Sequence, residues 1–249
     1  ALDAAEQIEK MQYAQEMVKE KKESCILHFD DHVRKKLERR KYLIGRMKQA
    51  IREGGFEMYY QPIYSWKEKK FLSMEALLRL RDHDGTLISP AEFIPVAEEV
   101  GLIDRIGWIV LDKVCAFMSE HPTLEMETAS VNMSMQQFMS KDFTEKVEAC
   151  LQKYALSSER IRIEITERMI SENTMKTTDT MRLLTEKGIR FYLDDFGMGY
   201  SNFAGVLSLP IETIKLDLTL VHGAFESDRK MVVLESIVDM LRKAGYSVV

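Results

Sequence analysis

The feature that most constrains the fold of this chain is a set of short apolar runs, each of which carries one or two polar side chains close to its end. There are five such runs: Met74–Leu77, Ser130–Met133, Ile163–Ile165, Tyr192–Asp195 and Ile214–Asp217. Helix-like segments separate them, and this alternation of strand and helix patterns favours a parallel α/β fold. A parallel barrel gathers the carboxyl ends of its strands at one mouth. We therefore expect the polar groups of these runs to lie within reach of one another.

The expected cluster is rich in carboxylates and needs countercharge. Its members are Glu75, Asn132, Glu164, Asp194 and Asp195. Two carboxylates about 4 Å apart repel each other by roughly 4 kcal/mol at an effective dielectric constant of 20. Lys215 can supply one positive charge, and divalent cations can supply the rest. Oxygen ligands with an amide among them suit Mg²⁺, Mn²⁺ or Ca²⁺ better than zinc.

Composition excludes several classes of protein. The 249 residues are 45% hydrophobic and 30% charged, as in an ordinary globular domain, and the net charge of −5 indicates neither a DNA- or RNA-binding surface nor a membrane surface. Three cysteines (Cys25, Cys115 and Cys150) form no even-numbered disulfide framework, which favours a reducing compartment. No apolar run is long enough to cross a bilayer, and the N-terminus does not resemble a signal peptide. We expect a cytoplasmic domain, whether or not other domains anchor it to a membrane.

The pattern divides the chain into two parts. Residues 1–50 are predicted to be a helical linker or the tail of an upstream domain, with a helix over about 1–22 and a short strand over 25–29. A second helix, capped by Asp30 or Asp31, ends at Gly54-Gly55. Its apolar positions fall on one face: Val33, Leu37, Ile44, Met47 and Ile51. A dimerising helix is the alternative for this segment.

Residues 51–249 are predicted to form the barrel domain. The expected strands are 56–63, 71–78, 128–133, 160–165, 190–194, 213–217 and 246–249. The expected helices are about 90–100, 104–120, 141–155, 173–187 and 228–244. The expected helix N-caps are Asp104, Ser140, Asn173 and Ser227, and Gly188 and Gly245 should follow helix ends. Seven strands without a Gly-rich nucleotide turn favour a barrel over a doubly wound sheet.

A set of ordered motifs resembles the EAL domain family of cyclic di-GMP phosphodiesterases. The motifs are Tyr60-Gln61-Pro62, Glu75-Ala76-Leu77-Leu78-Arg79, Ser89–Pro95, Val131-Asn132, Glu164–Glu167, Asp194–Gly197 and Lys215-Leu216-Asp217. The triplet Glu-Ala-Leu alone is weak, because it recurs by chance, but the order and spacing hold over about residues 56–249. The first segment faintly resembles the end of a GGDEF domain.

The resemblance implies a TIM-like (β/α)8 barrel whose first strand is antiparallel, preceded here by a helical segment. It implies two Mg²⁺ or Mn²⁺ ions at the strand ends and hydrolysis of cyclic di-GMP to linear pGpG. Two metals a few ångströms apart suit an in-line phosphoryl displacement. The family also implies a homodimer and an upstream GGDEF or sensor domain as partners.

The resemblance assigns a role to each matching residue. Glu75, Asn132, Glu164 and Asp194 would be metal ligands, and Asp195 would complete a second metal site. Lys215 would orient the water or offset charge at phosphorus, alongside Glu75 and Asp194 in catalysis, and Asp217 would lie beside the bound substrate. Arg79 would clamp the substrate phosphate, Gln61 would contact the dinucleotide, and Glu167 would hold the loop Phe196–Phe203, where Gly197 and Gly199 permit a sharp bend.

Each of these residues also has a purely structural interpretation. Taken singly, Glu75 is a surface acid on an edge strand, Asn132 a satisfied amide, and Lys215 a side chain that reaches to solvent. Asp194-Asp195 followed by Phe-Gly is typical of a capping turn. Their joint occurrence favours the metal site over five independent coincidences.

The sequence departs from the family pattern at a few places. Leu218 stands where an Arg is usual, and Met198 where Thr is common. The family continues past the position of Val249 with a Glu-Gly-Val-Glu run, whose first Glu is the expected general base, and then with an eighth strand. We therefore expect an open barrel truncated in strand seven, and little or no turnover from these 249 residues alone.

Two other functions compete with the phosphodiesterase. One is a non-catalytic cyclic di-GMP receptor or protein-interaction module, which would bind the dinucleotide without turning it over. The other is an enolase-like barrel, in which strand-end acids hold Mg²⁺ and a lysine abstracts a proton. The adjacent Asp pair and the Glu75–Arg79 run argue against the latter.

Overall fold

The structure is a computed structural model of the whole chain. It describes residues 30–172, 174–197, 205–206 and 209–249, together with residues 11, 13 and 15. The described chain forms two compact units: residues 1–56 with 80–102, and residues 57–79 with 103–249. The continuous strands β1 and β2 contribute residues to both units.

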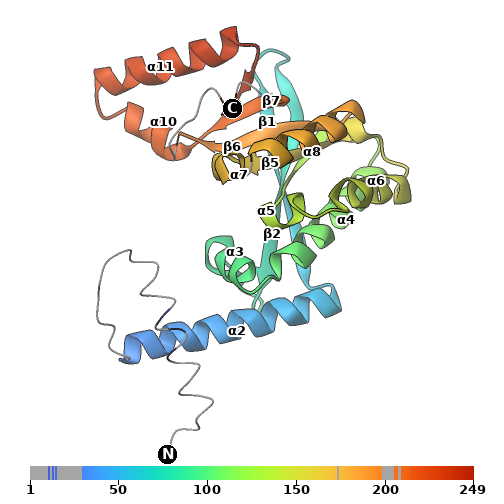
Figure 1. Cartoon of the computed structure of the whole chain (residues 1–249), viewed down its shortest axis with the longest axis vertical. Coiled ribbons are helices and arrows are strands. Elements are labelled where there is room, and N and C mark those ends of the chain that lie inside the picture. Colours follow the sequence, from blue (N-terminus) through green and yellow to red (C-terminus); the bar gives the residue numbers. More distant parts are fainter. Residues whose placement is uncertain are drawn as a thin grey trace, which may run out of the picture. The chain divides into compact units, whose positions relative to one another are not determined.

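Helices and strands alternate along most of the chain, as the sequence pattern predicts (Figure 1). The described strands are β1 (Phe56–Ser65), β2 (Lys70–Arg81), β3 (Leu87–Ile88), β4 (Thr128–Asn132), β5 (Ile161–Thr166), β6 (Arg190–Phe196), β7 (Ile211–Leu216) and β8 (Ser247–Val248). The described helices are α2 (Asp31–Glu53), α3 (Pro90–Glu99), α4 (Ile103–Glu120), α5 (Met135–Phe138), α6 (Phe143–Lys153), α7 (Glu167–Glu172), α8 (Thr174–Glu186), α10 (Leu218–Ala224) and α11 (Asp228–Lys243), with a 3₁₀ turn over Ser158–Arg160.

The first unit is built on the amphipathic helix α2, which packs against α3. Its N-cap is Asp30, whose side chain accepts a hydrogen bond from the Val33 N–H at 2.9 Å, as predicted. Gly54 ends the helix in the left-handed region (φ +75°), which a glycine adopts at little cost. The buried face differs in part from the predicted one: Leu43 and Ala50 are buried, whereas the predicted Ile44 and Ile51 are only partly covered.

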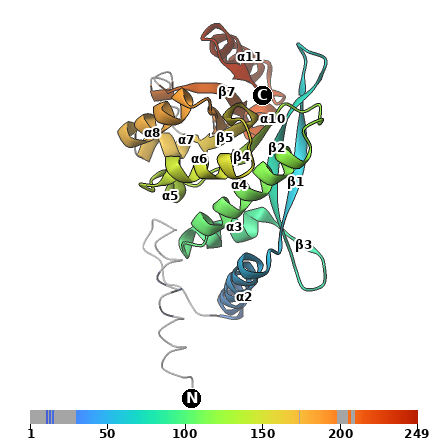
Figure 2. The same ribbon diagram turned by 90° about the vertical axis from the view of Figure 1, so that its right-hand side faces the viewer.

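The second unit contains most of a curled sheet in the order β1-β2-β4-β5-β6-β7-β8, with β3 paired to β2. β1 and β2 are neighbours joined by a four-residue turn, a connection that only antiparallel strands allow, so the first strand runs opposite to β2 (Figure 2). The short strand β3 is also antiparallel to β2. The pairs from β2–β4 through β7–β8 are all parallel. This is the mixed barrel-type sheet that the sequence predicts.

Alternation along the central strands separates an outer apolar face from an inner polar face. On β5, Ile161, Ile163 and Ile165 are fully buried and alternate with Arg162 and Glu164. The same period of two on β6 places Phe191 and Leu193 opposite to Tyr192 and Asp194. The outer face packs against helices, among them α4 on β4 and α8 on β6. The inner face therefore collects the polar side chains.

The curled sheet does not close within the described residues, in agreement with the predicted open barrel. A cavity of about 460 Å³ lies between the turn of the β1–β2 hairpin and the segment Tyr246–Val249. The inner-face side chains of Arg162, Tyr192 and Thr213 also line it. Arg162 there forms an ion pair with Glu212 at 3.0 Å.

Most predicted elements are confirmed, with local corrections. Ser227 caps α11 as predicted, and Gly188 and Gly245 follow α8 and α11 with positive φ. The predicted cap Asp104 is wrong: α4 already begins at Ile103, and the Asp104 carboxylate accepts a hydrogen bond from Trp108. Ser140 is also wrong as a cap, because α6 begins at Phe143 after Asp142.

Several predictions lie outside the described residues. These are the helix over about 1–22, the strand over 25–29, the cap Asn173 and the loop positions Met198 to Phe203. Among the described helices, none combines the length and apolar composition that a membrane-spanning segment needs.

Candidate metal centre

Four parallel strands of the sheet bring together the polar groups of the inner face. Glu75 comes from β2, Glu164 from β5, Asp194 from β6 and Lys215 from β7. The sheet register explains their common level, because Asn132 is paired with Glu164 and Thr166 with Asp194. All four side chains belong to the second unit. We call them the carboxylate–lysine cluster.

Lys215 is the centre of this cluster. Its Nζ lies 2.8 Å from Glu75 Oε2, 2.9 Å from Glu164 Oε2 and 3.3 Å from Asp194 Oδ2. The Lys215 side chain is 13% exposed and that of Glu164 is fully buried. One ammonium group therefore faces three carboxylates in a region with little access to water.

Burial and the excess of negative charge shift the pKa values of Glu164 and Lys215. Burial raises the pKa of Glu164 to about 7, because desolvation outweighs the attraction of Lys215, and the nearby charge of Glu75 acts in the same direction. Burial opposes the charge of Lys215, but Glu164 and Asp194 attract it more strongly, so its pKa is raised. The lysine therefore stays charged at neutral pH.

The donor set fits a hard divalent cation. Oxygen atoms of Glu75, Glu164 and Asp194 all lie within 4.8 Å of one another. The buried Oε1 of Glu164 has no hydrogen-bond partner, a costly arrangement for a polar atom unless a further ligand satisfies it. Carboxylate oxygens are the ligands that Mg²⁺, Mn²⁺ and Ca²⁺ prefer. These residues can therefore hold such an ion.

Two predicted ligands flank the cluster. The Asn132 amide donates a hydrogen bond to Glu75 Oε1 at 3.3 Å. Asp195 has a left-handed backbone (φ +56°), which is uncommon for a residue other than glycine, and its N–H binds Asp194 Oδ1 at 3.0 Å. Desolvation and the neighbouring Asp194 charge raise the pKa of Asp195, although much of its side chain is exposed.

Glu167 connects β5 with the segment that follows β6. It lies at the first position of α7, three residues after Glu164, and its Oε2 accepts a hydrogen bond from the Gly197 N–H at 3.4 Å. Gly197 has φ +101°, and a Cβ there would lie 2.8 Å from Leu220 Cδ2. A larger residue would therefore be strained at this position for two reasons.

The remaining predicted residues lie outside the carboxylate–lysine cluster. Gln61 is exposed on β1, and the Arg79 guanidinium lies 5.3 Å from the centre of the Tyr59 ring. Asp217 caps α10. Its carboxylate accepts hydrogen bonds from the Thr219 hydroxyl group and from the Thr219 N–H (2.7 Å for the N–H), which lower the pKa of the carboxyl group. Tyr59 was not predicted, although the period of two on β1 places it on the same face as Gln61.

The curled α/β sheet and the carboxylates on its inner face define a barrel-type domain with a candidate metal site, and comparison with known proteins identifies the family. The EAL domain model matches residues 44–249. The chain belongs to the EAL domain family. This confirms the predicted family and its barrel-type fold.

Individual relatives agree with this assignment. Signaling protein YkoW of Bacillus subtilis is 34% identical over 205 residues, which are 82% of this chain and 26% of that protein. Cyclic di-GMP phosphodiesterase PdeB of Shewanella oneidensis is 30% identical over 206 residues, 82% of this chain and 24% of that protein. The chain thus spans about a quarter of the length of these curated relatives.

A solved structure has a similar fold over most of the chain. The PaMucR phosphodiesterase in complex with c-di-GMP matches with a TM-score of 0.78 at 26% identity, over 83% of this chain and 85% of that chain.

Proposed function

We propose that this chain is most of the catalytic domain of a metal-dependent phosphodiesterase that, as the full-length protein, hydrolyses cyclic di-GMP to linear pGpG. The observation that carries the proposal is the convergence of Glu75, Glu164 and Asp194 around Lys215 in an EAL domain. The names of PdeB and of the PaMucR complex support the substrate.

The metal ligands in this proposal are the strand-end oxygen donors. Glu75, Asn132, Glu164 and Asp194 would hold Mg²⁺ or Mn²⁺, and Asp195 would add a ligand for a second ion. An ion held by these residues would supply activation of a water nucleophile and stabilisation of the charge that develops during an in-line displacement. The unpartnered Glu164 Oε1 supports this assignment because it has no other ligand among the described residues.

Residues of the chain itself position and stabilise the reacting groups. Lys215 remains charged and would offset the negative charge that develops at phosphorus. Arg79 would bind a substrate phosphate through its planar guanidinium, which the Tyr59 ring supports from one side. Gln61 would contact the dinucleotide and Asp217 would lie beside it. Glu167 would keep the segment after Asp195 in place through its bond to Gly197.

The wider organisation belongs to the same proposal. Residues 1–50 would link the EAL domain (51–249) to an upstream GGDEF or sensor domain. The chain would act as a homodimer in the cytoplasm, with the loop after Asp195 coupling dimerisation to metal binding. Analytical ultracentrifugation would detect the dimer, and a monomer at micromolar concentration would contradict it.

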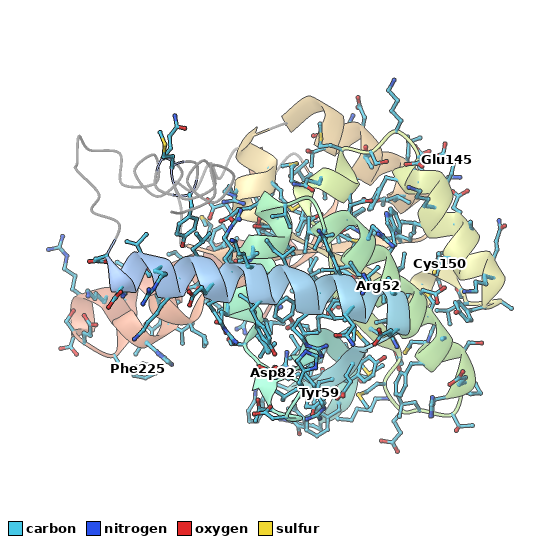
Figure 3. All side chains as sticks on the ribbon, turned by 90° about the horizontal axis from the view of Figure 1, so that it is seen from below. Arg52, Tyr59, Asp82, Glu145, Cys150 and Phe225 are labelled. Carbon is cyan, nitrogen blue, oxygen red and sulfur yellow. The ribbon has the colours of Figure 1, made fainter. Side chains whose placement is uncertain are left out.

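Turnover of the dinucleotide tests the main proposal. The full-length protein is incubated with cyclic di-GMP and either Mg²⁺ or Mn²⁺, and the products are separated by chromatography. We expect pGpG, and no product from Glu75→Ala. Glu145→Ala is the matched control, since Glu145 is an exposed carboxylate on α6 (Figure 3). Folded protein that binds cyclic di-GMP in the presence of either metal, but forms no pGpG, would refute the enzyme and select the receptor.

Metal binding has a readout that does not depend on activity. The electron paramagnetic resonance signal of free Mn²⁺ decreases when the ion binds to protein. We expect Glu164→Gln to weaken Mn²⁺ binding at least tenfold and Glu145→Gln to leave it unchanged. Equal binding by both variants would exclude the carboxylate–lysine cluster as the metal site.

A further inference from the structure

Two cysteines face each other on the outer helical layer, away from the residues of the proposed function. Helices α4 and α6 pack together. Three hydrogen bonds identify the faces through which the two helices contact each other. Asp112 Oδ1 binds Lys153 Nζ at 2.5 Å, Asp112 Oδ2 binds the Tyr154 hydroxyl at 2.9 Å, and Ser119 Oγ donates to the Tyr154 carbonyl at 2.9 Å.

Helical spacing places the cysteines on these same faces. Cys115 lies three residues after Asp112 and four before Ser119, and Cys150 lies three residues before Lys153. Residues three and four apart share one side of a helix. The packed helix faces therefore bring the two thiol groups toward each other, and each thiol shifts the pKa of the other through a hydrogen bond.

The two thiols differ in access to solvent. Both are free thiols; Cys115 is fully buried, whereas Cys150, labelled in Figure 3, is partly exposed. The hydrogen bond to Cys150 and burial raise the pKa of Cys115, while the hydrogen bond from Cys115 lowers the pKa of Cys150. The accessible thiol is therefore the better nucleophile of the pair. A dithiol with one accessible and one buried sulfur has the arrangement of an attacking and a resolving cysteine.

We propose that Cys115 and Cys150 form a reactive dithiol, which low-molecular-weight disulfides oxidise to an intramolecular disulfide between α4 and α6.

The reaction balances in two exchange steps. The Cys150 thiolate attacks one sulfur of the small disulfide, forms a mixed disulfide and expels one small thiolate. Cys115 then attacks the Cys150 sulfur, expels the second small thiolate and transfers its proton to that thiolate. Two electrons pass from the cysteine pair to the small disulfide, which is reduced to two thiols.

The new bond would close a loop that contains all of β4. Such a cross-link restricts the unfolded chain, so the melting temperature should rise by roughly 5–10 °C on oxidation. β4 carries Asn132 at its end, so the closed loop would contain one of the residues predicted to bind the metal.

The test uses the Cys25→Ser variant, which leaves only the proposed pair. Folded protein is treated with oxidised glutathione and then denatured for a thiol count and an intact mass. We expect the loss of both thiols, a mass lower by two hydrogen atoms, and the higher melting temperature. Retention of both thiols, stable glutathione adducts, or disulfides only between chains would each overturn the proposal.

Two further variants in the same background test the order of the steps. Cys115→Ser should stop at the mixed disulfide and retain one glutathione on Cys150. Cys150→Ser should keep its single buried thiol unmodified. The reverse pattern would contradict the assigned roles. Circular dichroism of each variant before treatment verifies that it is folded.

Discussion

Two clusters of charged side chains contain similar groups but differ in burial and in charge balance. In the first unit, the Arg39 guanidinium binds Glu92 through two hydrogen bonds of 2.6 and 3.0 Å, and it lies 3.8 Å from Asp82. The Arg39 and Glu92 side chains are 41% and 38% exposed. In the second unit, Lys215 meets three carboxylates, one of them fully buried.

This difference separates a structural contact from a binding site. Hydrogen bonds from Arg39 lower the pKa of Glu92, and water solvates the exposed polar atoms of both side chains. In the carboxylate–lysine cluster the pKa of Glu164 is raised instead, and one of its oxygens has no partner. The exposed cluster is complete without further ligands. The buried one has a surplus of negative charge that a cation can neutralise.

The largest expected difference between the clusters is in turnover. In the full-length protein, Glu164→Gln should reduce pGpG formation by a factor of about 10³ or more, because several kcal/mol of transition-state stabilisation depend on the bound metal. Glu92→Gln should change the rate by less than about twofold. Rates under saturating cyclic di-GMP measure both, and similar losses in the two variants would remove the functional distinction.

The second difference is in the free energy of unfolding after the positively charged side chain of each cluster is removed. Lys215→Met leaves three carboxylates without countercharge in a buried place and should lower the free energy of unfolding by about 3–5 kcal/mol. Arg39→Met, in the exposed cluster, should cost about 1 kcal/mol or less. Urea denaturation in the presence of a chelator gives both values. If divalent cations are the natural countercharge, Mn²⁺ should restore part of the stability of Lys215→Met but not of Arg39→Met.

The third difference is in pH dependence. The folded state binds a proton on Glu164 more tightly than the unfolded state, since the folded pKa is about 7 and the ordinary value is 4.5. Stability should therefore fall by about 1–3 kcal/mol as pH rises from about 4.5 to 7 in metal-free buffer.

The matched variants separate the two pH windows. Glu164→Gln should flatten the curve between pH 4.5 and 7. The pKa of Glu92 is lowered, so its contribution is present above its unfolded value and is lost only at more acidic pH. Glu92→Gln should therefore change the curve only below about pH 4.5. A curve that is already flat in the wild type between pH 4.5 and 7 would contradict the raised pKa of Glu164.

The smallest effect concerns salt. A double-mutant cycle on Arg39 and Glu92 should give a coupling energy of about 0.2–1 kcal/mol at 0.1 M salt, and close to zero at 1 M, where the Debye length is about 3 Å. The coupling of Lys215 with Glu164 should depend much less on salt, because solvent ions do not enter a buried pair. Equal salt sensitivity would mean that the second cluster is open to solvent.

Much of the fold follows from local patterns in the sequence. The alternation of apolar and polar residues over Ile161–Ile165 is enough to place Glu164 on the inner face. A parallel barrel gathers the carboxyl ends of its strands at one mouth, and this is enough to bring Glu164 near Glu75 and Asp194. Four short elements, β3, α5, α7 and α10, were not predicted, since segments this short carry little periodic signal. The capping of α10 by Asp217 was also missed, although Asp followed by Thr two residues later is a known capping pattern.

The site was less predictable in its detail. Nothing in the spacing of the motifs indicates that a single Lys215 Nζ contacts three carboxylates at once, because this depends on the curl of the sheet and on side-chain length. The same holds for the raised pKa of Glu164, which depends on how completely the folded chain buries its carboxyl group. The roles of Gln61, Arg79 and Asp217 stay predictions. Their side chains lie outside the carboxylate–lysine cluster, where only a bound substrate would bring them into use.

The contact between Lys215 and Glu75 joins residues that are 140 positions apart in the chain. Ribosomes add roughly 5–20 residues per second, so Glu75 is made roughly 7–28 s before the lysine that neutralises it. Glu164 and Asp194 are added during that interval, so the nascent polypeptide contains all three carboxylates of the cluster before their countercharge. Formation of the carboxylate–lysine cluster therefore has to wait until translation has passed Lys215.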